Sequence, residues 1–307
     1  MEVIMDYIVI MKGLCVVGLI LNIALVASKV KKNRATEEGE AQWQAQKKFF
    51  AWNAMVGFVA NFFDTLGIGS YAPSSAMLKL RGSVDDINIP GTLNVGDTTP
   101  VLLEAFLFFG FVDLDPLTLV SMLIAAVLGA FVGAGIVTKW NLYHVRIGMG
   151  VGLCVLGIVM VCKQVGVGPF GIVGTATGLT GGKLVIGVVV NFFLGALMNV
   201  AVGLYAPCMA LISALGMSIK AAFPIMMGSC AYLMAFGNGP KFIKENRFDM
   251  VATICQMLFG AIGVLCAYFI VKSLPITVLL WVVVCVVFFT SFMFFKDAKK
   301  MKKDGLA

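Results

Sequence analysis

The sequence predicts an all-α polytopic membrane protein, built from two inverted-topology repeats with broken or re-entrant helices plus an extra C-terminal helix. Three observations predict this fold class: the composition, a series of long apolar stretches and an internal repeat. Of the 307 residues, 60% are hydrophobic and 13% are charged, and the mean hydropathy is +0.97. A soluble domain is typically about 45–50% apolar and about 25% charged. These values exclude a soluble domain, a nucleic-acid-binding protein, a secreted disulfide scaffold and a disordered chain.

The apolar stretches supply the predicted helices, because a spanning helix needs about 20 apolar residues. Long candidates lie near 4–28, 49–69, 97–112, 116–138, 146–163, 182–204, 222–236, 248–271 and 276–296. Two shorter pieces, 73–81 and 207–217, would each cross about half a bilayer. Such pieces are typical of re-entrant or broken helices. The polar segments 29–48, 82–96 and 237–247 are predicted to be loops.

The net charge of +7 comes largely from two basic clusters, in the segment 29–48 and in the C-terminal tail. An excess of Lys and Arg beside membrane spans marks cytoplasmic segments. We therefore expect both clusters to face the cytoplasm, the N-terminus to lie outside, and the protein to reside in the inner (cytoplasmic) membrane. A nucleic-acid-binding patch is the alternative, and the apolar stretches beside both clusters argue against it.

An internal repeat appears when the sequence is shifted by 134 positions. Gly69-Ser70-Tyr71-Ala72-Pro73 then aligns with Gly203-Leu204-Tyr205-Ala206-Pro207, and Gly82 aligns with Gly216. With the basic clusters placed inside, the count of membrane crossings predicts that 49–69 runs outward and that its counterpart 182–204 runs inward. The two repeats are therefore predicted to be inverted. The predicted division is 1–138 for the first repeat, 139–274 for the second, inverted repeat, and 275–307 for a final transmembrane helix and basic cytoplasmic tail.

Inverted repeats with Gly/Pro-interrupted helices are typical of secondary transporters, whose substrate site lies where the interrupted helices meet. Pro73 and Pro207 are expected at the first position of a helix. The free N–H groups of such a helix end suit a small anion. The alternative interpretation is that both G-x-Y-A-P strings only kink a helix for packing.

Candidate substrate-binding residues surround the two breaks, although hydroxyl, amide and thiol groups also serve simply to join helices. In the first half they are Asn61, Thr65, Gly67, Gly69, Ser70, Tyr71, Pro73, Ser74, Thr98 and Thr99. In the second half they are Asn199, Gly203, Tyr205, Pro207, Cys208 and Ser229.

Three acids within apolar stretches, Asp64, Asp97 and Glu104, are candidates for proton coupling. An ionised carboxylate inside a membrane costs several kcal/mol, so such an acid should face the bundle interior and can carry a proton. The alternatives are a structural hydrogen bond, above all for Glu104, and a helix N-cap for Asp97.

Other residue patterns argue against an enzyme. The chain has one histidine, His144, and its eight cysteines lie in apolar stretches without a C-x-x-C pair. No metal, cofactor or disulfide is therefore expected. A phosphate-binding G-x-x-x-x-G-K-[ST] loop is absent, so the sequence predicts no ATP hydrolysis.

The stretch Phe-Phe-Asp-Thr-Leu-Gly-Ile-Gly-Ser-Tyr-Ala-Pro at 62–73, its echo at 203–207 and the two-half layout resemble the TauE/SafE sulfite exporter family, over nearly the whole chain. The resemblance implies a secondary carrier that exports a small sulfur-containing anion, such as sulfite or an organosulfonate, and is coupled to the proton gradient. The family positions carried over are Gly67, Gly69, Pro73, Gly203 and Pro207.

The expected partners are a small anionic substrate and the lipid bilayer, without nucleic acid, and a homo-oligomer is left open. Three alternatives remain: an ion channel, a structural membrane subunit, and a carrier of a different small organic anion. A channel is expected to show a filter motif or rings of charge, and neither is seen in the sequence.

Overall fold

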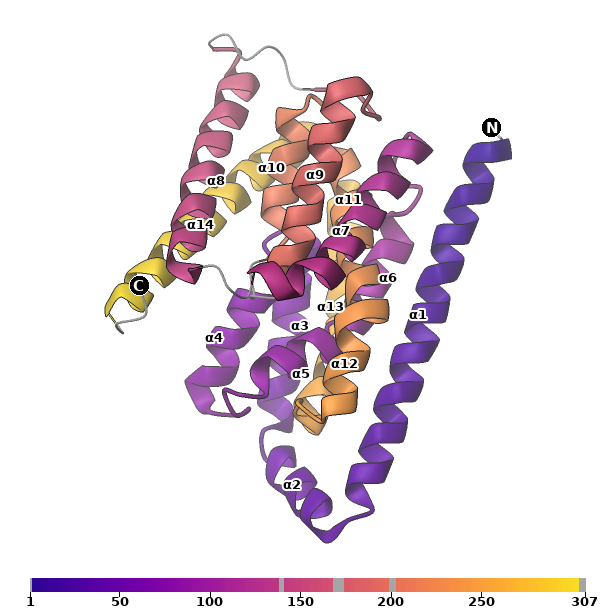
Figure 1. The fold of residues 1–307 in the computed structure, drawn as a ribbon, viewed down its shortest axis with the longest axis vertical. Coiled ribbons are helices and arrows are strands. Elements are labelled where there is room, and N and C mark those ends of the chain that lie inside the picture. Colours follow the sequence, from indigo (N-terminus) through magenta and orange to yellow (C-terminus); the bar gives the residue numbers. More distant parts are fainter. Residues whose placement is uncertain (1, 138–140, 168–173, 199–202, 304–307) are drawn as a thin grey trace. The chain divides into compact units, whose positions relative to one another are not determined.

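The protein is helical in the part that the computed structural model describes, which is residues 2–137, 141–167, 174–198 and 203–303 (Figure 1). Within these residues, five helices are long and apolar enough to cross a membrane. They are Tyr7–Arg34, Tyr143–Val165, Ile219–Glu245, Met250–Ser273 and Thr277–Lys303. The predicted class, an all-α polytopic membrane protein, is confirmed.

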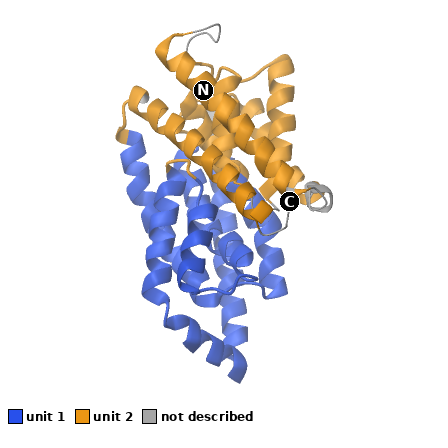
Figure 2. Cartoon of the chain, turned by 90° about the vertical axis from the view of Figure 1, so that its left-hand side faces the viewer, with its two compact units in different colours: residues 1–65, 69–109, 230–272 blue, residues 66–68, 110–229, 273–307 orange. Residues whose placement is uncertain are grey.

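The chain forms two compact units (Figure 2). Unit 1 comprises residues 1–65, 69–109 and 230–272, and unit 2 comprises 66–68, 110–229 and 273–307. Each unit therefore takes segments from both predicted repeats.

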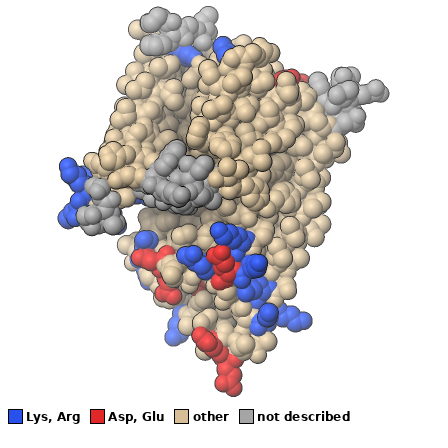
Figure 3. All heavy atoms as spheres, viewed as in Figure 1, with Lys and Arg blue, Asp and Glu red and all other residues tan. Residues whose placement is uncertain are grey.

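Unit 1 contains the N-terminal helices and most of the polar side chains discussed below. Its elements are α1 (Glu2–Arg34), α2 (Glu37–Lys47), α3 (Phe50–Thr65), α4 (Tyr71–Arg81), α5 (Ile89–Gly96), α6 (Thr98–Phe108), the π-helix η2 (Met234–Asn238), α12 (Gly239–Glu245) and α13 (Met250–Ser273). Thr36 caps the start of the short helix α2, because its hydroxyl accepts a hydrogen bond from the Gly39 N–H at 3.1 Å. On the face in Figure 3, charged side chains gather at the α2 end of this unit.

Unit 2 contains α7 (Pro116–Val137), α8 (Leu142–Val165), α9 (Gly181–Leu197), α10 (Tyr205–Ala214) and α14 (Ile276–Lys303). Helix α11 (Ile219–Leu233) begins in unit 2 and ends in unit 1. Helices α7 and α9 pack backbone against backbone at two glycines. A Cβ on Gly129 would collide with the Phe192 carbonyl, and one on Gly195 with the Ala126 carbonyl, so only glycine fits at either position.

Both predicted interruptions exist, because α3 ends at Thr65 before α4 begins, and α9 ends at Leu197 before α10 begins. In the first break Gly67 and Gly69 have φ of +94° and +90°, a conformation that favours glycine. The expected place of Pro73 and Pro207 at the first helical position is wrong, since each is the third residue of its helix. The N–H of the third position also lacks an intrahelical acceptor, so proline is tolerated there as well.

Three segments predicted as loops are partly helical. Helix α1 continues to Arg34 and is followed by α2, residues 89–96 form α5, and residues 239–245 form α12. In α5 every residue except Pro90 is buried. A Cβ on Gly91 would collide with the Arg247 carbonyl, and one on Gly96 would lie 2.7 Å from the Gln256 Cβ. Tertiary packing therefore outweighs the weak helix propensity of this segment.

Helix boundaries repeat at the same shift of 134 residues as the sequence. The starts of α4 and α10, of α7 and α13, and of α8 and α14 all correspond at this shift. Gly82 and Gly216, which follow α4 and α10, both have positive φ, +56° and +89°. These boundaries agree with the shift found in the sequence, but the match of α8 to α14 pairs a helix of the predicted second repeat with the predicted extra C-terminal helix.

Candidate functional site

The three predicted proton-coupling acids are all buried in unit 1. Asp64 lies near the end of α3, Asp97 joins α5 to α6, and Glu104 lies within α6. Their exposed fractions are 3%, 0% and 0%. The carboxyl groups of Asp64 and Asp97 are close enough to interact electrostatically. The fold thus gathers the three acids in one compact unit.

Asn61 connects α3 to two other parts of unit 1. Its Nδ2 lies 3.2 Å from Asp97 Oδ1, 3.2 Å from Gln256 Oε1 and 2.9 Å from the Gly57 carbonyl. An amide carries only two N–H hydrogens, so these three acceptors share two donors. Asn61 therefore holds Asp97 and the side chain of Gln256, on α13, against α3.

The Thr65 hydroxyl contacts Glu104 Oε1 at 2.7 Å and the Asn61 carbonyl at 3.1 Å. One hydroxyl hydrogen serves one acceptor at a time, and the carboxyl contact is the shorter. A hydroxyl can also accept from a protonated acid, so Thr65 can hold Glu104 in either protonation state.

Asp64 closes the first helix break. Its Oδ1 accepts a hydrogen bond from the Ser70 backbone N–H at 2.9 Å, just before α4. The Ser70 side chain lies near the carboxyl groups of both Asp64 and Asp97. The start of α4, where the sequence suggests an anion site, thus faces a carboxyl group of the protein itself.

Asp97 does not act as a helix cap. Its backbone is in the right-handed helical region at φ −75° and ψ −10°, and its side chain makes no cap hydrogen bond. Helix α5 therefore runs almost directly into α6, and the carboxyl group instead takes part in the contact with Asn61.

Several buried polar atoms of unit 1 have no hydrogen-bond partner among the described residues. They are Asn53 Nδ2 and Oδ1, Asn61 Oδ1, Tyr71 OH, Ser74 Oγ, Asn94 Oδ1, Asp97 Oδ2, Thr253 Oγ1 and Gln256 Nε2. Tyr71 interacts electrostatically with Asp64 and Asp97, and Gln256 contacts Asn61. Buried polar atoms are normally satisfied by protein or water. Of these atoms, Asn61 Oδ1, Asp97 Oδ2 and Gln256 Nε2 belong to side chains that contact one another in the acid cluster.

The remaining first-half candidates lie close to this cluster along the chain. Gly69 and Pro73 belong to unit 1 and flank the start of α4. The Thr98 hydroxyl donates to the Asn94 carbonyl at 2.5 Å, and Thr99 Oγ1 accepts from Asn22 Nδ2 at 3.1 Å. Both threonines are thus engaged in contacts between or within helices.

The second-half candidates and Gly67 belong to unit 2. They are Gly67, Gly203, Tyr205, Pro207, Cys208 and Ser229, whereas Asn199 lies outside the described residues. Tyr205, Pro207, Cys208 and Ser229 are buried. Gly203 does not have the positive φ of Gly69, so the two breaks differ in local conformation.

Unit 2 repeats the asparagine contact of unit 1. The string Asn-Phe-Phe occurs at 61–63 on α3 and at 191–193 on α9. Asn191 Nδ2 lies 2.7 Å from the Met122 carbonyl on α7 and 3.1 Å from Ser229 Oγ. Position 122 corresponds to position 256 at the shift of 134, but Asn191 is 130 residues after Asn61, and it contacts a backbone carbonyl where Asn61 contacts the side chain of Gln256. The two contacts are therefore similar without being equivalent in register.

The acids are not repeated. Asp64 directly follows the first Asn-Phe-Phe string, whereas Leu194 directly follows the second. At the shift of 134, Asp97 corresponds to Ala231 and Gln256 corresponds to Met122. The polar cluster therefore belongs to unit 1, and unit 2 carries an apolar version of the same helix contact.

Sequence reasoning missed Gln256, Thr253, Asn22 and Asn191, which are single polar residues within apolar helices. The repeated Asn-Phe-Phe string was the available signal for Asn191. Among the described residues, no group of His, Cys, Asp and Glu side chains is arranged to hold a metal ion. In comparisons with protein-family models, curated proteins and solved structures, no match to this chain was found.

Proposed function

We propose that the chain is a secondary transporter that exports a small sulfur-containing anion, such as sulfite or an organosulfonate. Proton coupling runs through Asp64, Asp97 and Glu104 of unit 1. The observation that carries the proposal is the burial of three carboxyl groups beside the neutral partners Asn61, Thr65 and Ser70.

Buried acids of this kind favour proton exchange. Neither Asp64 nor Asp97 takes part in an ion pair within the described part of the chain. An ionised carboxylate without a counter-charge is costly inside a membrane protein, and acids in this situation often form proton relays.

The same cluster accounts for coupling to an anion. Ionised Asp64 and Asp97 repel an anion at short range, where the effective dielectric is low. Protonation removes that repulsion and leaves the Tyr71 hydroxyl and Gln256 Nε2 as donors toward the anion. Proton and anion then cross in the same direction, and net export follows when the outward anion gradient exceeds the inward proton gradient.

The two helix interruptions support the transporter part of the proposal. Secondary transporters of this type place substrate and coupling ions near interrupted helices at the interface of the two repeats. Both interruptions are present, and α4 and α10, which follow them, begin 134 residues apart. The preference for a sulfur-containing anion is supported by the resemblance of 62–73 and 203–207 to the TauE/SafE family alone.

Uptake into proteoliposomes tests the proposal, with sulfite, thiosulfate, taurine and a simple carboxylate as candidate substrates. A carrier gives saturable, pH-dependent flux and counterflow. Asp97→Asn should lose the pH dependence, while Asp113→Asn, at an exposed acid of unit 2, keeps it. Flux without saturation or counterflow would indicate a channel, and the absence of flux with every anion would favour a structural subunit.

A further inference from the structure

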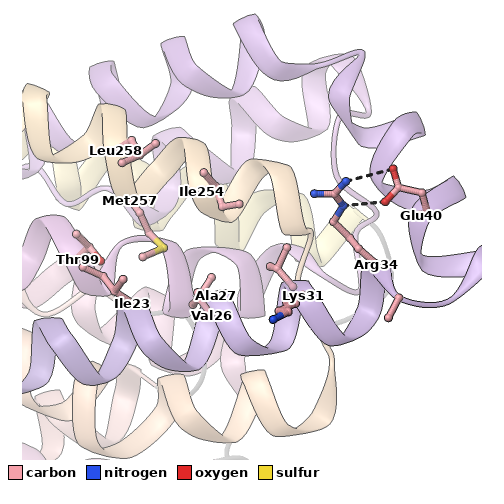
Figure 4. A pocket seen from close by; sticks show the side chains of 12 residues that line it. Ile23, Val26, Ala27, Lys31, Arg34, Glu40, Thr99, Ile254, Met257 and Leu258 are labelled. Atoms are coloured by element: carbon pink, nitrogen blue, oxygen red, sulfur yellow. Dashed lines mark hydrogen bonds and ion pairs between the residues drawn. The ribbon is translucent and has the colours of Figure 1, made fainter.

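A groove in unit 1 runs along α1 beside α13 (Figure 4). It encloses about 620 Å³. Ile23 and Ala27 line it from α1, and Ile254, Met257 and Leu258 line it from α13. Most of its wall is therefore aliphatic, and its position follows the length of a candidate spanning helix.

The apolar wall lies at the surface of the unit. Ile23 is 46% exposed and Leu258 is 58% exposed. Large aliphatic side chains at the surface of a spanning helix contact lipid chains in a membrane. The apolar part of the groove thus suits a hydrocarbon chain better than a hydrated solute.

The length of the groove matches one leaflet of a bilayer. Its α1 wall runs from Ile23 to Arg34, which is about 16 Å along the axis at about 1.5 Å per residue. The hydrocarbon core of a bilayer is about 30 Å thick, so this distance is about half of it.

The end of the groove is basic. Lys31 and Arg34 line it there, in the last turn of α1, together with Glu40. The Arg34 guanidinium contacts the Glu40 carboxylate at 2.8 Å and 3.4 Å, and it lies 4.6 Å from the centre of the Trp43 ring. The charged groups lining this end sum to +1, which complements a phosphate group.

We propose that this groove binds one anionic phospholipid, with an acyl chain along the apolar wall and the phosphate at Lys31 and Arg34. Basic pockets beside spanning helices on the cytoplasmic side are suited to anionic headgroups. The inner part of the groove is lined by Thr99, on α6, two residues after Asp97. The bound lipid thus lies against the segment that carries part of the acid cluster.

Native mass spectrometry of the purified full chain, titrated with phosphatidylglycerol and with phosphatidylcholine, tests the proposal. Phosphatidylglycerol should bind more tightly. Lys31→Gln with Arg34→Gln should weaken it by about fivefold for each charge removed. The matched control is Lys29→Gln with Lys32→Gln, which removes the same charge from α1 outside the groove. Glu40→Gln should tighten binding, because it frees Arg34 from a competing carboxylate.

The acyl-chain part is tested by Ala27→Trp, which fills the groove, against Ala24→Trp, an exposed position on α1 that does not line it. Loss of phosphatidylglycerol in the first variant only supports the proposal. If Ala27→Trp does not fold, Ile23→Trp, at a second exposed residue that lines the apolar wall, takes its place.

Three results would overturn the proposal. Equal retention of both lipids would mean that the groove does not recognise a headgroup. Equal loss in the lysine control would mean that diffuse surface charge holds the lipid. Displacement of phosphatidylglycerol by inorganic phosphate alone would identify an ion site.

Discussion

Replacing Gln256 by methionine gives α13 the residue that its counterpart position has in α7. The side chain is fully buried and the two residues have similar size, so packing is expected to persist. The change removes the 3.2 Å contact between Asn61 Nδ2 and Gln256 Oε1, worth about 0.5–1.5 kcal/mol. Asn61 keeps its contacts to Asp97 and to the Gly57 carbonyl.

The same change also removes Gln256 Nε2, which is buried without a partner among the described residues. Leaving such a group unsatisfied costs about 1–3 kcal/mol, so its removal offsets the lost hydrogen bond. The free energy of unfolding is therefore expected to stay level or to rise by up to about 2 kcal/mol.

Transport should respond in the opposite way, because Nε2 is one of the donors that the proposed function offers to the anion. A hydrogen bond to a charged group is worth about 1.5–3 kcal/mol, which corresponds to an affinity loss of about 10-fold to 150-fold. The assay is the KM of anion uptake in proteoliposomes, measured beside thermal unfolding in detergent. Met122→Leu in unit 2 is the control and should leave KM unchanged.

Two results would refute this reasoning. Wild-type KM in a stably folded Gln256→Met variant would show that Gln256 does not contact the anion. Unfolding well below the wild-type temperature would show that the hydrogen-bond balance around Asn61 is wrong.

Three further predictions follow from the structure. Asp64→Asn keeps an acceptor for the Ser70 N–H, so it should fold normally but lose pH-dependent transport; unchanged pH dependence would remove Asp64 from coupling. Gly69→Leu should lose about 1–2 kcal/mol of stability, because φ of +90° strains a side chain, whereas Gly203→Leu should not; equal losses on thermal unfolding would contradict this. Burial, and then the charge of Asp85, raises the pKa of Asp249 from 3.8 to about 6. The folded state therefore binds this proton more tightly than the unfolded state does. The resulting contribution to the free energy of unfolding is fully present below about pH 4 and is lost as the pH rises through about 6. Asp249→Asn, which can still accept from the Ala252 N–H, should flatten stability against pH in that window, and an unchanged profile would exclude Asp249 as its source.

The helix breaks could be predicted from the sequence because their causes are local. Glycine permits positive φ at Gly67 and Gly69, and the first turn of a helix tolerates the prolines at 73 and 207. Helices α4 and α10 begin two residues before the predicted pieces 73–81 and 207–217. Charge and hydropathy likewise predicted the class of protein, since these are sums over the whole chain.

Helix α5 and the contacts of the acid cluster depend on residues far away in the sequence. Gly91 is helical because it packs against the Arg247 carbonyl, and Asn61 meets Gln256 across 195 positions. A lone glutamine in an apolar helix carries no local signal of its partner. The acids themselves could be found, because a carboxylate in an apolar stretch is unusual in any context.

The glycine contacts within the helix pairs limit how this chain can move. In unit 2, Gly129 and Gly195 bring the backbones of α7 and α9 together, and in unit 1 a Cβ on Gly263 of α13 would collide with the Phe58 carbonyl of α3. Backbone atoms in direct contact cannot be separated by a change of side-chain rotamer. Each pair is therefore held at backbone contact, and a larger residue at any of these three glycines would force its two helices apart. At Gly69, by contrast, a Cβ would meet open space, and the φ of +90° is what favours glycine there.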